Sequence, residues 1–233
     1  MNGAKYNYTV DQQDLDFSQR ASAAAMVKYL LSAAGLDAVA RGFGVTQISS
    51  DNHTWVLSRL AVEFAQMPKM GDRLEIRTWV SDAERLLSTR NFEVTDYSGE
   101  VVAQATSRWS MIDLSTRRPI NLSTMEMTCV DELSPIEPPR RIDSSLTQLV
   151  TQHRAAYSDI DFNCHVNTLR YIDMMLDAMP FEHLQNNNIS RLDIHFMRES
   201  KIGELLSIKR SGGVFEIIHE DGTVSIKAEI TLA

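Results

Sequence analysis

The alternation of apolar and polar residues along the chain predicts eight strands. In each of these runs roughly every second side chain is apolar, as in a strand that turns one face toward a core. Turns that contain glycine, such as Tyr-Ser-Gly-Glu at 97–100, separate neighbouring runs and favour hairpins in a mainly antiparallel sheet. The predicted strands cover residues 55–66, 72–83, 88–97 and 100–112 in the first half of the chain, and 190–199, 204–212, 214–220 and 224–232 in the second.

A segment with a helical pattern precedes each group of strands. Residues 22–40 include the run AAAMVKYLLSAAG, which has high helix propensity and is so apolar that the helix must be largely enclosed. In the second half, apolar residues three or four positions apart mark one face of a helix that Pro180 helps to end. We interpret this stripe as core; its members are Val166, Leu169, Ile172, Leu176 and Met179.

The order of helix and strands occurs twice because the chain contains an internal repeat. Three blocks recur in the same order, at offsets of 145, 132 and 123 residues. Similarity between amphipathic strands, the alternative explanation, does not account for the glycines that match in both copies, Gly71 with Gly203 and Gly99 with Gly222. The matched blocks are 14–20 with 159–165, 59–64 with 191–196, and 92–94 with 215–217.

A region rich in proline separates the two copies. Pro119, Pro135, Pro138 and Pro139 lie in a stretch with no sustained helical or alternating period. The sequence therefore predicts an α+β chain with an N-terminal domain at 1–115, a linker at 116–150 and a C-terminal domain at 151–233. In each domain an antiparallel sheet wraps around a central helix.

Composition and charge narrow the classes of function. The chain has 233 residues, 43% of them hydrophobic, and a formal net charge of −8, which disfavours nucleic acid or an anionic membrane as the main partner. Only Cys129 and Cys164 are present, so a disulfide framework is excluded and a reducing compartment is favoured. We find no apolar run long enough for a membrane span and no signal-peptide pattern at the start, and we expect a cytoplasmic protein.

The two copies differ in side chains that can do chemistry. Asp161 has a counterpart in Asp16, but Asn163, His165 and Glu199 replace a serine, an arginine and a methionine of the first copy. If residues 161–165 are extended, Asp161, Asn163 and His165 share one face. His165 is expected directly before a helix, where backbone N–H groups can hold an oxyanion. Glu199 is expected on a mostly apolar strand, where a carboxylate is costly unless it is paired or functional.

Each candidate residue also has a structural interpretation. Asp161 and Asn163 are good capping residues, His165 alone could be a hydrogen-bonded structural histidine, and Glu199 could be an exposed charge at a strand end. The remaining histidines have no comparable neighbours in the sequence and are treated as structural or exposed. No metal-ligand spacing, glycine-rich phosphate loop or G-x-S-x-G motif is found, so we expect neither a metal nor a cofactor.

Several segments resemble the acyl-ACP thioesterase family, whose members have tandem hotdog domains. These segments are GDRLEIRTWV, RWSMIDLSTRRPINL and, most specifically, YSDIDFNCHVNTLRYIDMMLDAMP, which is similar to the family's Asp-x-Asn-x-His-Val-Asn signature at 161–167. The family's Arg-Glu-Cys motif corresponds to Arg198-Glu199-Ser200, with serine in place of cysteine. This departure rules out a thiol nucleophile here, whereas a scheme in which Asp161, Asn163, His165 and Glu199 direct water is matched at all four positions.

The resemblance implies hydrolysis of fatty acyl-acyl carrier protein thioesters to free fatty acid. It also implies an acyl pocket in the first domain and an acidic carrier protein as partner. The small face at Ala23–Ala25 with Met26 could leave room for such a pocket, and tight packing of the helix is the alternative explanation for these residues. Arg117-Arg118 and Arg140-Arg141 are candidates for the docking patch, and a homodimer is compatible with the sequence. The alternatives are an acyl-CoA thioesterase, a hotdog dehydratase or hydratase, and a non-catalytic acyl-binding module.

Overall fold

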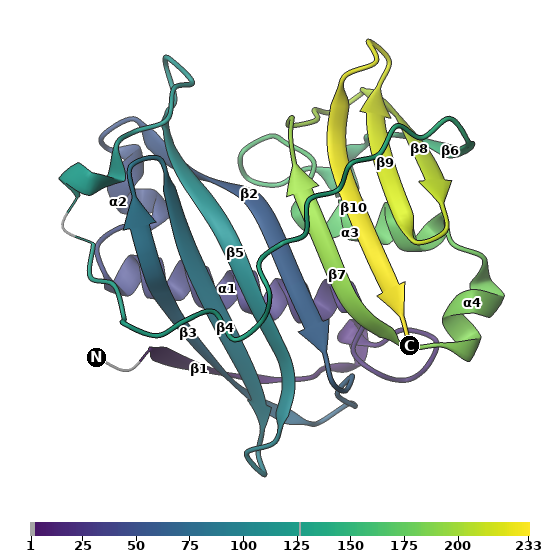
Figure 1. Cartoon of the computed structure of the whole chain (residues 1–233), viewed down its shortest axis with the longest axis horizontal. Coiled ribbons are helices and arrows are strands. Elements are labelled where there is room, and N and C mark those ends of the chain that lie inside the picture. The colour runs from purple at the N-terminus through teal and green to yellow at the C-terminus, as the bar shows by residue number, and fades with distance from the viewer. Residues whose placement is uncertain (1–2, 126) are drawn as a thin grey trace. The chain divides into compact units, whose positions relative to one another are not determined.

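A computed structural model describes residues 3–125 and 127–233, and these residues form two compact units. The units are Met1–Pro139 and Arg140–Ala233, so the division falls inside the segment predicted as a linker. Each unit is an antiparallel sheet with one long helix against it, α1 in the first and α3 in the second (Figure 1). This α+β arrangement is the hotdog architecture expected from the sequence.

The described residues of the first unit form five strands and two α-helices. The strands follow the order β1-β3-β4-β5-β2, and each neighbouring pair is antiparallel. The prediction of a helix at 22–40 is confirmed, since Ser22 caps the first turn of α1 by accepting from the Ala25 amide. The elements are β1 Ala4–Thr9, α1 Ala23–Ala40, α2 Val45–Ser49, β2 His53–Phe64, β3 Arg73–Glu84, β4 Leu87–Asp96 and β5 Val101–Asp113.

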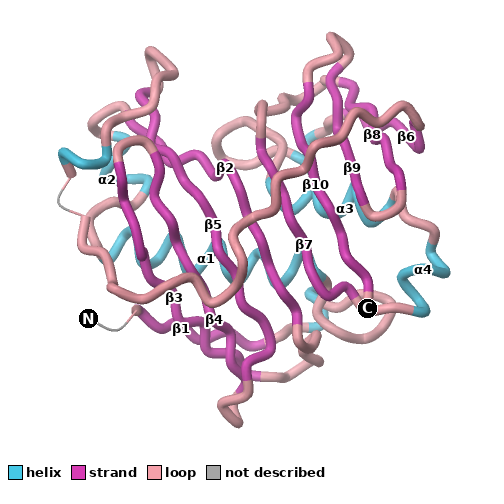
Figure 2. The backbone as a smooth tube through the Cα atoms, in the orientation of Figure 1, coloured by secondary structure: helices cyan, strands magenta, loops and turns pink. Residues whose placement is uncertain are grey.

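The second unit repeats this plan with shorter strands. Its order, β6-β8-β9-β10-β7, is that of the first unit strand for strand (Figure 2). Asn167 caps α3 at the position equivalent to Ser22, and its side chain accepts from the Leu169 amide. The elements are β6 Leu149–Arg154, α3 Thr168–Asp177, α4 Phe181–Asn186, β7 Ile189–Phe196, β8 Leu205–Ser211, β9 Val214–His219 and β10 Val224–Leu232.

The matched glycines occupy equivalent turns in the two units. Gly71 and Gly203 precede β3 and β8 with φ of 85° and 83°, and Gly99 and Gly222 connect the last hairpins with φ of 87° and 82°. Only glycine enters this region without steric cost from a Cβ atom. The internal repeat found in the sequence is therefore a repeat of the three-dimensional plan.

Helix α1 corrects the expectation that the chain has no apolar run long enough for a membrane span. It has 18 residues with a mean hydropathy of 1.4, so by length and composition it is a candidate for a membrane span. In the structure 56% of the helix is buried inside the protein, and two charged residues on it are paired: Lys28 with Asp14 and Asp37 with Arg90. A core helix enclosed by its own domain passes the same test of length and hydropathy.

Two strands and two short α-helices of the described residues were not predicted. Strands β1 and β6 were missed because both are short edge strands, and α2 and α4 are single short turns of helix. The segment 116–150 is irregular up to β6 but not loose: Leu122, Val130 and Ile136 are buried in the first unit and Ile142 in the second. Residues 1 and 2 of the predicted first domain and residue 126 of the predicted linker lie outside the described residues.

Candidate active site

The site begins with a tight turn at residues 161–165, just before α3. The Asp161 carboxylate accepts hydrogen bonds from the backbone amides of Asn163 (2.8 Å) and His165 (3.3 Å). The Asp161 amide donates to the carbonyl oxygen of His165 at 2.8 Å, and Cys164 takes a φ of 63°. The prediction that these residues are extended is wrong, because an aspartate side chain that binds amides two and four residues ahead closes the chain into a turn.

The first unit contains the same turn without the catalytic candidates. The Asp16 carboxylate accepts from the Ser18 amide at 2.8 Å, the Asp16 amide donates to the carbonyl oxygen of Arg20 at 2.9 Å, and Gln19 has a φ of 62°. Two of the bonds of Asp161, from the Asn163 amide and to the His165 carbonyl oxygen, are therefore part of the repeated scaffold. The bond from the His165 amide is an addition of the second unit; in the first unit Asp16 instead accepts from the Ser18 hydroxyl.

A backbone hydrogen bond brings the two halves of the site together. The Val166 amide donates to the carbonyl oxygen of Ser200 at 2.8 Å, so the residues that precede them in the chain, His165 and Glu199, lie side by side. The imidazole Nε2 of His165 is 3.3 Å from Oε2 of Glu199, with 23% and 32% of the two side chains exposed. Glu199 lies in the loop after β7, which ends at Phe196, so the prediction of a strand position for it is wrong.

The equivalent positions of the first unit also touch. The amide of Ala21 donates to the carbonyl oxygen of Pro68 at 2.7 Å, and the Arg20 guanidinium donates to the carbonyl oxygen of Met67 at 2.9 Å. The fold therefore creates this contact in both units. Only the second unit fills it with an imidazole and a carboxylate, the kinds of side chain that serve as general acids and bases.

Asn163 is part of the turn but is not joined to the His165–Glu199 pair by a contact. Its backbone amide binds Asp161, and its side chain is exposed, with no hydrogen bond to it anywhere in the described part of the chain. The side-chain amide is thus open to solvent and to a bound substrate. Its catalytic role stays a prediction, as do the roles of Asp161, His165 and Glu199.

The start of α3 offers fewer backbone donors than the sequence suggested. The amides of His165, Val166 and Asn167 donate to the Asp161 carboxylate, the Ser200 carbonyl and the Asp159 carbonyl respectively. His165 also lies two residues before the cap Asn167, not directly before the helix. These three N–H groups are therefore engaged inside the protein, so the expectation that they are available to a ligand is not met.

Beneath the turn, Asp159 anchors it to the rest of the unit. Its buried carboxylate accepts from the Ala156 amide (2.7 Å) and from Arg170 (3.1 Å), and it lies 2.7 Å from Nε2 of His153. Burial acts to raise the pKa of Asp159, but the Ala156, His153 and Arg170 contacts outweigh burial and hold this pKa below its ordinary value. Sequence reasoning assigned His153 no such partner.

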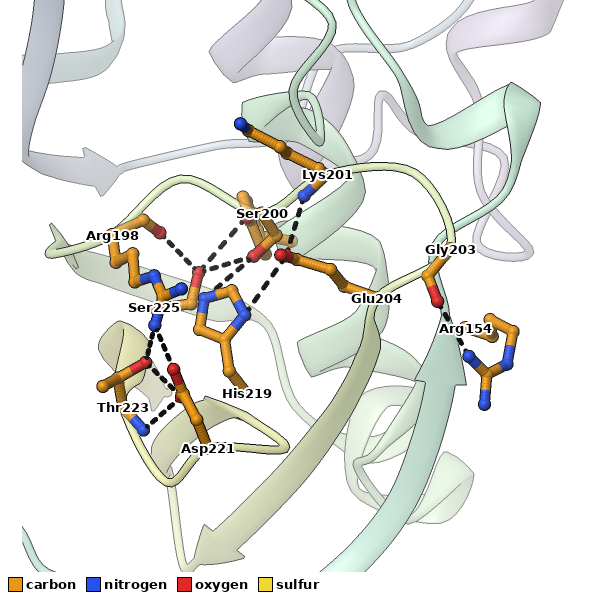
Figure 3. A network of polar contacts seen from close by, with 11 residues as sticks. Arg154, Arg198, Ser200, Lys201, Gly203, Glu204, His219, Asp221, Thr223 and Ser225 are labelled. Atoms are coloured by element: carbon orange, nitrogen blue, oxygen red, sulfur yellow. Dashed lines mark hydrogen bonds and ion pairs between the residues drawn. The ribbon is translucent and has the colours of Figure 1, made fainter.

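A second group missed from the sequence lies behind Glu199. Ser200, Ser225 and His219 are buried and are joined by polar contacts (Figure 3). The buried Tyr171 joins the group through its hydroxyl, which lies 3.2 Å from that of Ser225. The signal that could have revealed this group is the internal repeat, because the matched positions of the first copy carry no such chain of hydroxyl and imidazole groups.

The candidate docking arginines are exposed, and Arg140 and Arg141 have acidic neighbours. Arg140 lies 4.0 Å from Asp193 and Arg141 3.2 Å from Asp143, while Arg117 and Arg118 belong to an exposed turn of the first unit. Partial neutralisation by these aspartates weakens Arg140 and Arg141 as an attraction for an acidic partner.

Comparison with known proteins gives consistent matches along nearly the whole chain. Family models described as the acyl-ACP thioesterase N-terminal domain and C-terminal domain match residues 2–127 and 143–232. A palmitoyl-acyl carrier protein thioesterase of Gossypium hirsutum is 28% identical over 83% of this chain, and an oleoyl-acyl carrier protein thioesterase of Arabidopsis thaliana is 30% identical over 68% of it. The chain spans about half the length of the curated relatives it matches (51% and 48%).

Solved structures match over the full chain. The crystal structure of an acyl-ACP thioesterase from Bacteroides thetaiotaomicron is 36% identical, covers 99% of this chain and 97% of its own, and superposes with a TM-score of 0.90. A 12:0-ACP thioesterase from Umbellularia californica is 20% identical over 99% of this chain and 96% of its own, with a TM-score of 0.81, and shows the shared fold.

Proposed function

Because the chain belongs to the acyl-ACP thioesterase family, we propose that it hydrolyses the thioester bond of fatty acyl-acyl carrier protein. The products are a free fatty acid and the carrier with its thiol restored. The observation that supports this most directly is the contact of 3.3 Å between His165 and Glu199, at a position where the first unit has Arg20 and Met67. No cofactor or metal is required for this reaction.

The proposed mechanism uses water as the nucleophile. Glu199 and His165 hold a water molecule between them, and one of the two takes its proton as the oxygen attacks the thioester carbonyl. The tetrahedral intermediate then collapses with cleavage of the C–S bond, and the proton taken from the water passes to the leaving thiolate of the carrier. The exposed Asn163 side-chain amide donates to the carbonyl oxygen as charge develops on it, because the backbone amides of the following residues 165–167 are already engaged. Asp161 keeps the turn closed and so fixes the position of His165.

Substitution of the pair tests this assignment. His165→Ala and Glu199→Ala should each lower kcat by about 10²–10⁴-fold, which corresponds to about 3–5 kcal/mol of transition-state stabilisation. Arg20→Ala and Met67→Ala, the matched positions of the first unit, control for a change in folding. If both site variants turn over as fast as these controls, the assignment is refuted.

The same proposal assigns a substrate class, acyl chains carried by acyl carrier protein, and a separate role to each domain. We expect the first domain to house the acyl chain beside the small residues Ala23–Ala25 and the second to carry out the chemistry. Side-by-side assays with acyl-carrier and acyl-CoA substrates, with the product identified as free acid, test the carrier preference. A shifted double bond would indicate a dehydratase or hydratase, and tight acyl binding without turnover a binding module.

Docking of the carrier by charge has its own test. If Arg117 and Arg118 meet the acidic carrier protein, KM for the carrier-linked substrate rises with ionic strength, whereas KM for a small thioester does not. A cytoplasmic location and a homodimer stay predictions; the matched plant relatives are named as chloroplastic.

A further inference from the structure

We propose that a buried chain of polar side chains behind Glu199 is a positioning network for the reaction, with Ser225 at its centre. The chain consists of Tyr171, Ser200, His219 and Ser225 and is called the Ser200 network below. It rests on the proposed function, because it acts by holding Glu199 against His165. None of its members touches the substrate.

The Ser200 network forms hydrogen bonds with both residues that flank Glu199 in the sequence, Arg198 and Ser200. The Ser225 hydroxyl lies 2.8 Å from the carbonyl oxygen of Arg198, which accepts from it, and 3.0 Å from the hydroxyl of Ser200. The Ser225 carbonyl oxygen accepts from the amides of Met197 (2.9 Å) and Arg198 (3.3 Å). One serine of β10 therefore fixes the loop on both sides of the carboxylate (Figure 3).

The rest of the Ser200 network surrounds the Ser200 hydroxyl. Nε2 of His219 is 3.4 Å from this hydroxyl, and Nδ1 of the same ring is 3.2 Å from the carboxylate of Glu204. The phenol oxygen of Tyr171, from α3, lies 3.2 Å from the Ser225 hydroxyl. Both serines are completely buried, and Tyr171 and His219 are 4% and 6% exposed.

Ser200 connects the Ser200 network to both members of the catalytic pair. Its carbonyl oxygen accepts from the Val166 amide, next to His165, and its own position in the chain follows Glu199. A shift of Ser200 therefore moves the carboxylate and the imidazole relative to each other. Misplacement of a reacting group by about 1 Å is enough to lower a rate by about 10²-fold.

The first unit shows which of these bonds the fold requires. The carbonyl oxygen of Val102, which matches Ser225, accepts from two amides at 2.9 and 3.1 Å, so the main-chain clamp is present there too. Asp72 accepts from the Lys69 amide at 2.8 Å, as Glu204 accepts from the Lys201 amide at 2.9 Å. The scaffold thus needs the backbone bonds and the acidic turn residue in both copies.

The side chains of the Ser200 network are absent from the first unit. By the offsets of the repeat, Met26, Pro68, Asp96 and Val102 stand where the second unit has Tyr171, Ser200, His219 and Ser225. Apolar residues fill three of these places and the unit folds to the same plan. Since burying polar groups is costly unless they are hydrogen-bonded, their presence only behind the catalytic pair points to a role in the reaction.

The arrangement of Ser200, His219 and Glu204 resembles a nucleophile, a base and an orienting acid, but Ser200 is badly placed to attack a substrate. Its side chain has no exposed surface, and its hydroxyl lies within 3.0 Å of Ser225 as well as 3.4 Å from His219. A nucleophile must reach the thioester carbon, so a buried hydroxyl committed to neighbours is suited to positioning.

Four substitutions test the Ser200 network. Ser225→Val installs the residue of the first unit and Ser200→Ala removes the second hydroxyl, while Ser225→Thr keeps a hydroxyl on β10. His219→Gln replaces the imidazole with a side-chain amide, which can also form hydrogen bonds. Ser107→Ala is the matched control, because Ser107 is an equally buried serine of β5 whose hydroxyl donates to the carbonyl oxygen of Arg90 at 3.0 Å.

We expect kcat to fall by about 10–100-fold in Ser225→Val and Ser200→Ala while KM changes by less than about twofold. The kcat of Ser225→Thr should stay close to that of the wild-type enzyme. The kcat of His219→Gln should lie between the values for Ser225→Thr and Ser225→Val. Ser107→Ala should lose a similar amount of thermal stability with kcat unchanged. Unchanged kcat in Ser225→Val, or a loss matched by Ser107→Ala, overturns the proposal.

Two further measurements separate this proposal from its alternatives. In a crystal structure of Ser225→Val, the distance from His165 Nε2 to Glu199 Oε2 should exceed its present 3.3 Å, and an unchanged distance contradicts the positioning role. This readout does not depend on the substrate. If the wild-type chain hydrolyses no acyl-carrier substrate, that result refutes only the proposed function. Mass spectrometry of the enzyme quenched during turnover should find no acyl group on Ser200; an acyl-serine would make Ser200 a nucleophile and overturn the proposal.

Discussion

Asp161 and Asp16 form the same turn in the two units, and this allows the structural and catalytic parts of one aspartate to be separated. Asp161→Ala removes two accepted hydrogen bonds, from the amides of Asn163 and His165. Asp16→Ala also removes two, from the amide and the hydroxyl of Ser18. Each partly exposed bond contributes about 0.5–1 kcal/mol, so either variant should lose about 1–2 kcal/mol of stability.

The two variants should differ in activity. In Asp161→Ala the released turn no longer fixes His165 opposite Glu199, and we expect kcat to fall by at least about 10-fold more than in Asp16→Ala. Asp161→Asn is the decisive third variant, because its side-chain oxygen can still accept both amides. It should recover the stability, and a kcat that stays low would assign the charge of Asp161 a direct part in catalysis.

The location of the tryptophans makes the stability measurement specific. Trp55, Trp79 and Trp109 all lie in the first unit, so tryptophan fluorescence in a urea titration follows Asp16→Ala, and far-UV circular dichroism follows both. A loss of about 1–2 kcal/mol corresponds to a fall in Tm of about 2–8 °C. Hydrogen exchange at the amides of 163 and 165 reports the turn itself. Equal kcat in Asp161→Ala and Asp16→Ala would refute the link between the turn and His165.

Two further predictions concern the scaffold of the second unit. The pKa of the Asp159 carboxylate is held below its usual 3.8, so it contributes stability above that pH and this contribution is lost as the pH falls through its lower folded value. Hydrogen exchange of the second unit between pH 5 and pH 2 (about the range over which such a carboxylate titrates) should show this loss, and Asp159→Asn should remove it; an unaltered pH profile would contradict it. Gly203→Ala and Gly71→Ala should each lower the unfolding free energy by about 1 kcal/mol, because their φ of 83° and 85° strains any residue with a Cβ atom, although nothing lies within 4 Å of that position. Thermal unfolding of each variant measures this change, and a gain in stability instead of a loss would refute the assignment of strain.

The sequence alone determined the plan of the molecule. Strand alternation, the apolar segment at 22–40 and the ordered matches between the copies are local properties, and they predicted the two long helices α1 and α3, eight strands and the repeat. The short edge strands β1 and β6 escaped this reasoning, since a few exposed alternating residues do not differ from a loop. The repeat also singled out His165 and Glu199, because it showed which positions had changed between two copies of one scaffold.

Only the tertiary structure decided how these residues meet. The closed turn depends on the Asp161 side chain binding amides ahead of it, and the pairing of His165 with Glu199 depends on one hydrogen bond between Val166 and Ser200. The Ser200 network joins residues from α3, β9, β10 and the loop after β7, more than 50 positions apart at its extremes (171 to 225). Sequence patterns report the face that a residue occupies on its own element, whereas contacts between elements arise from packing distant segments together.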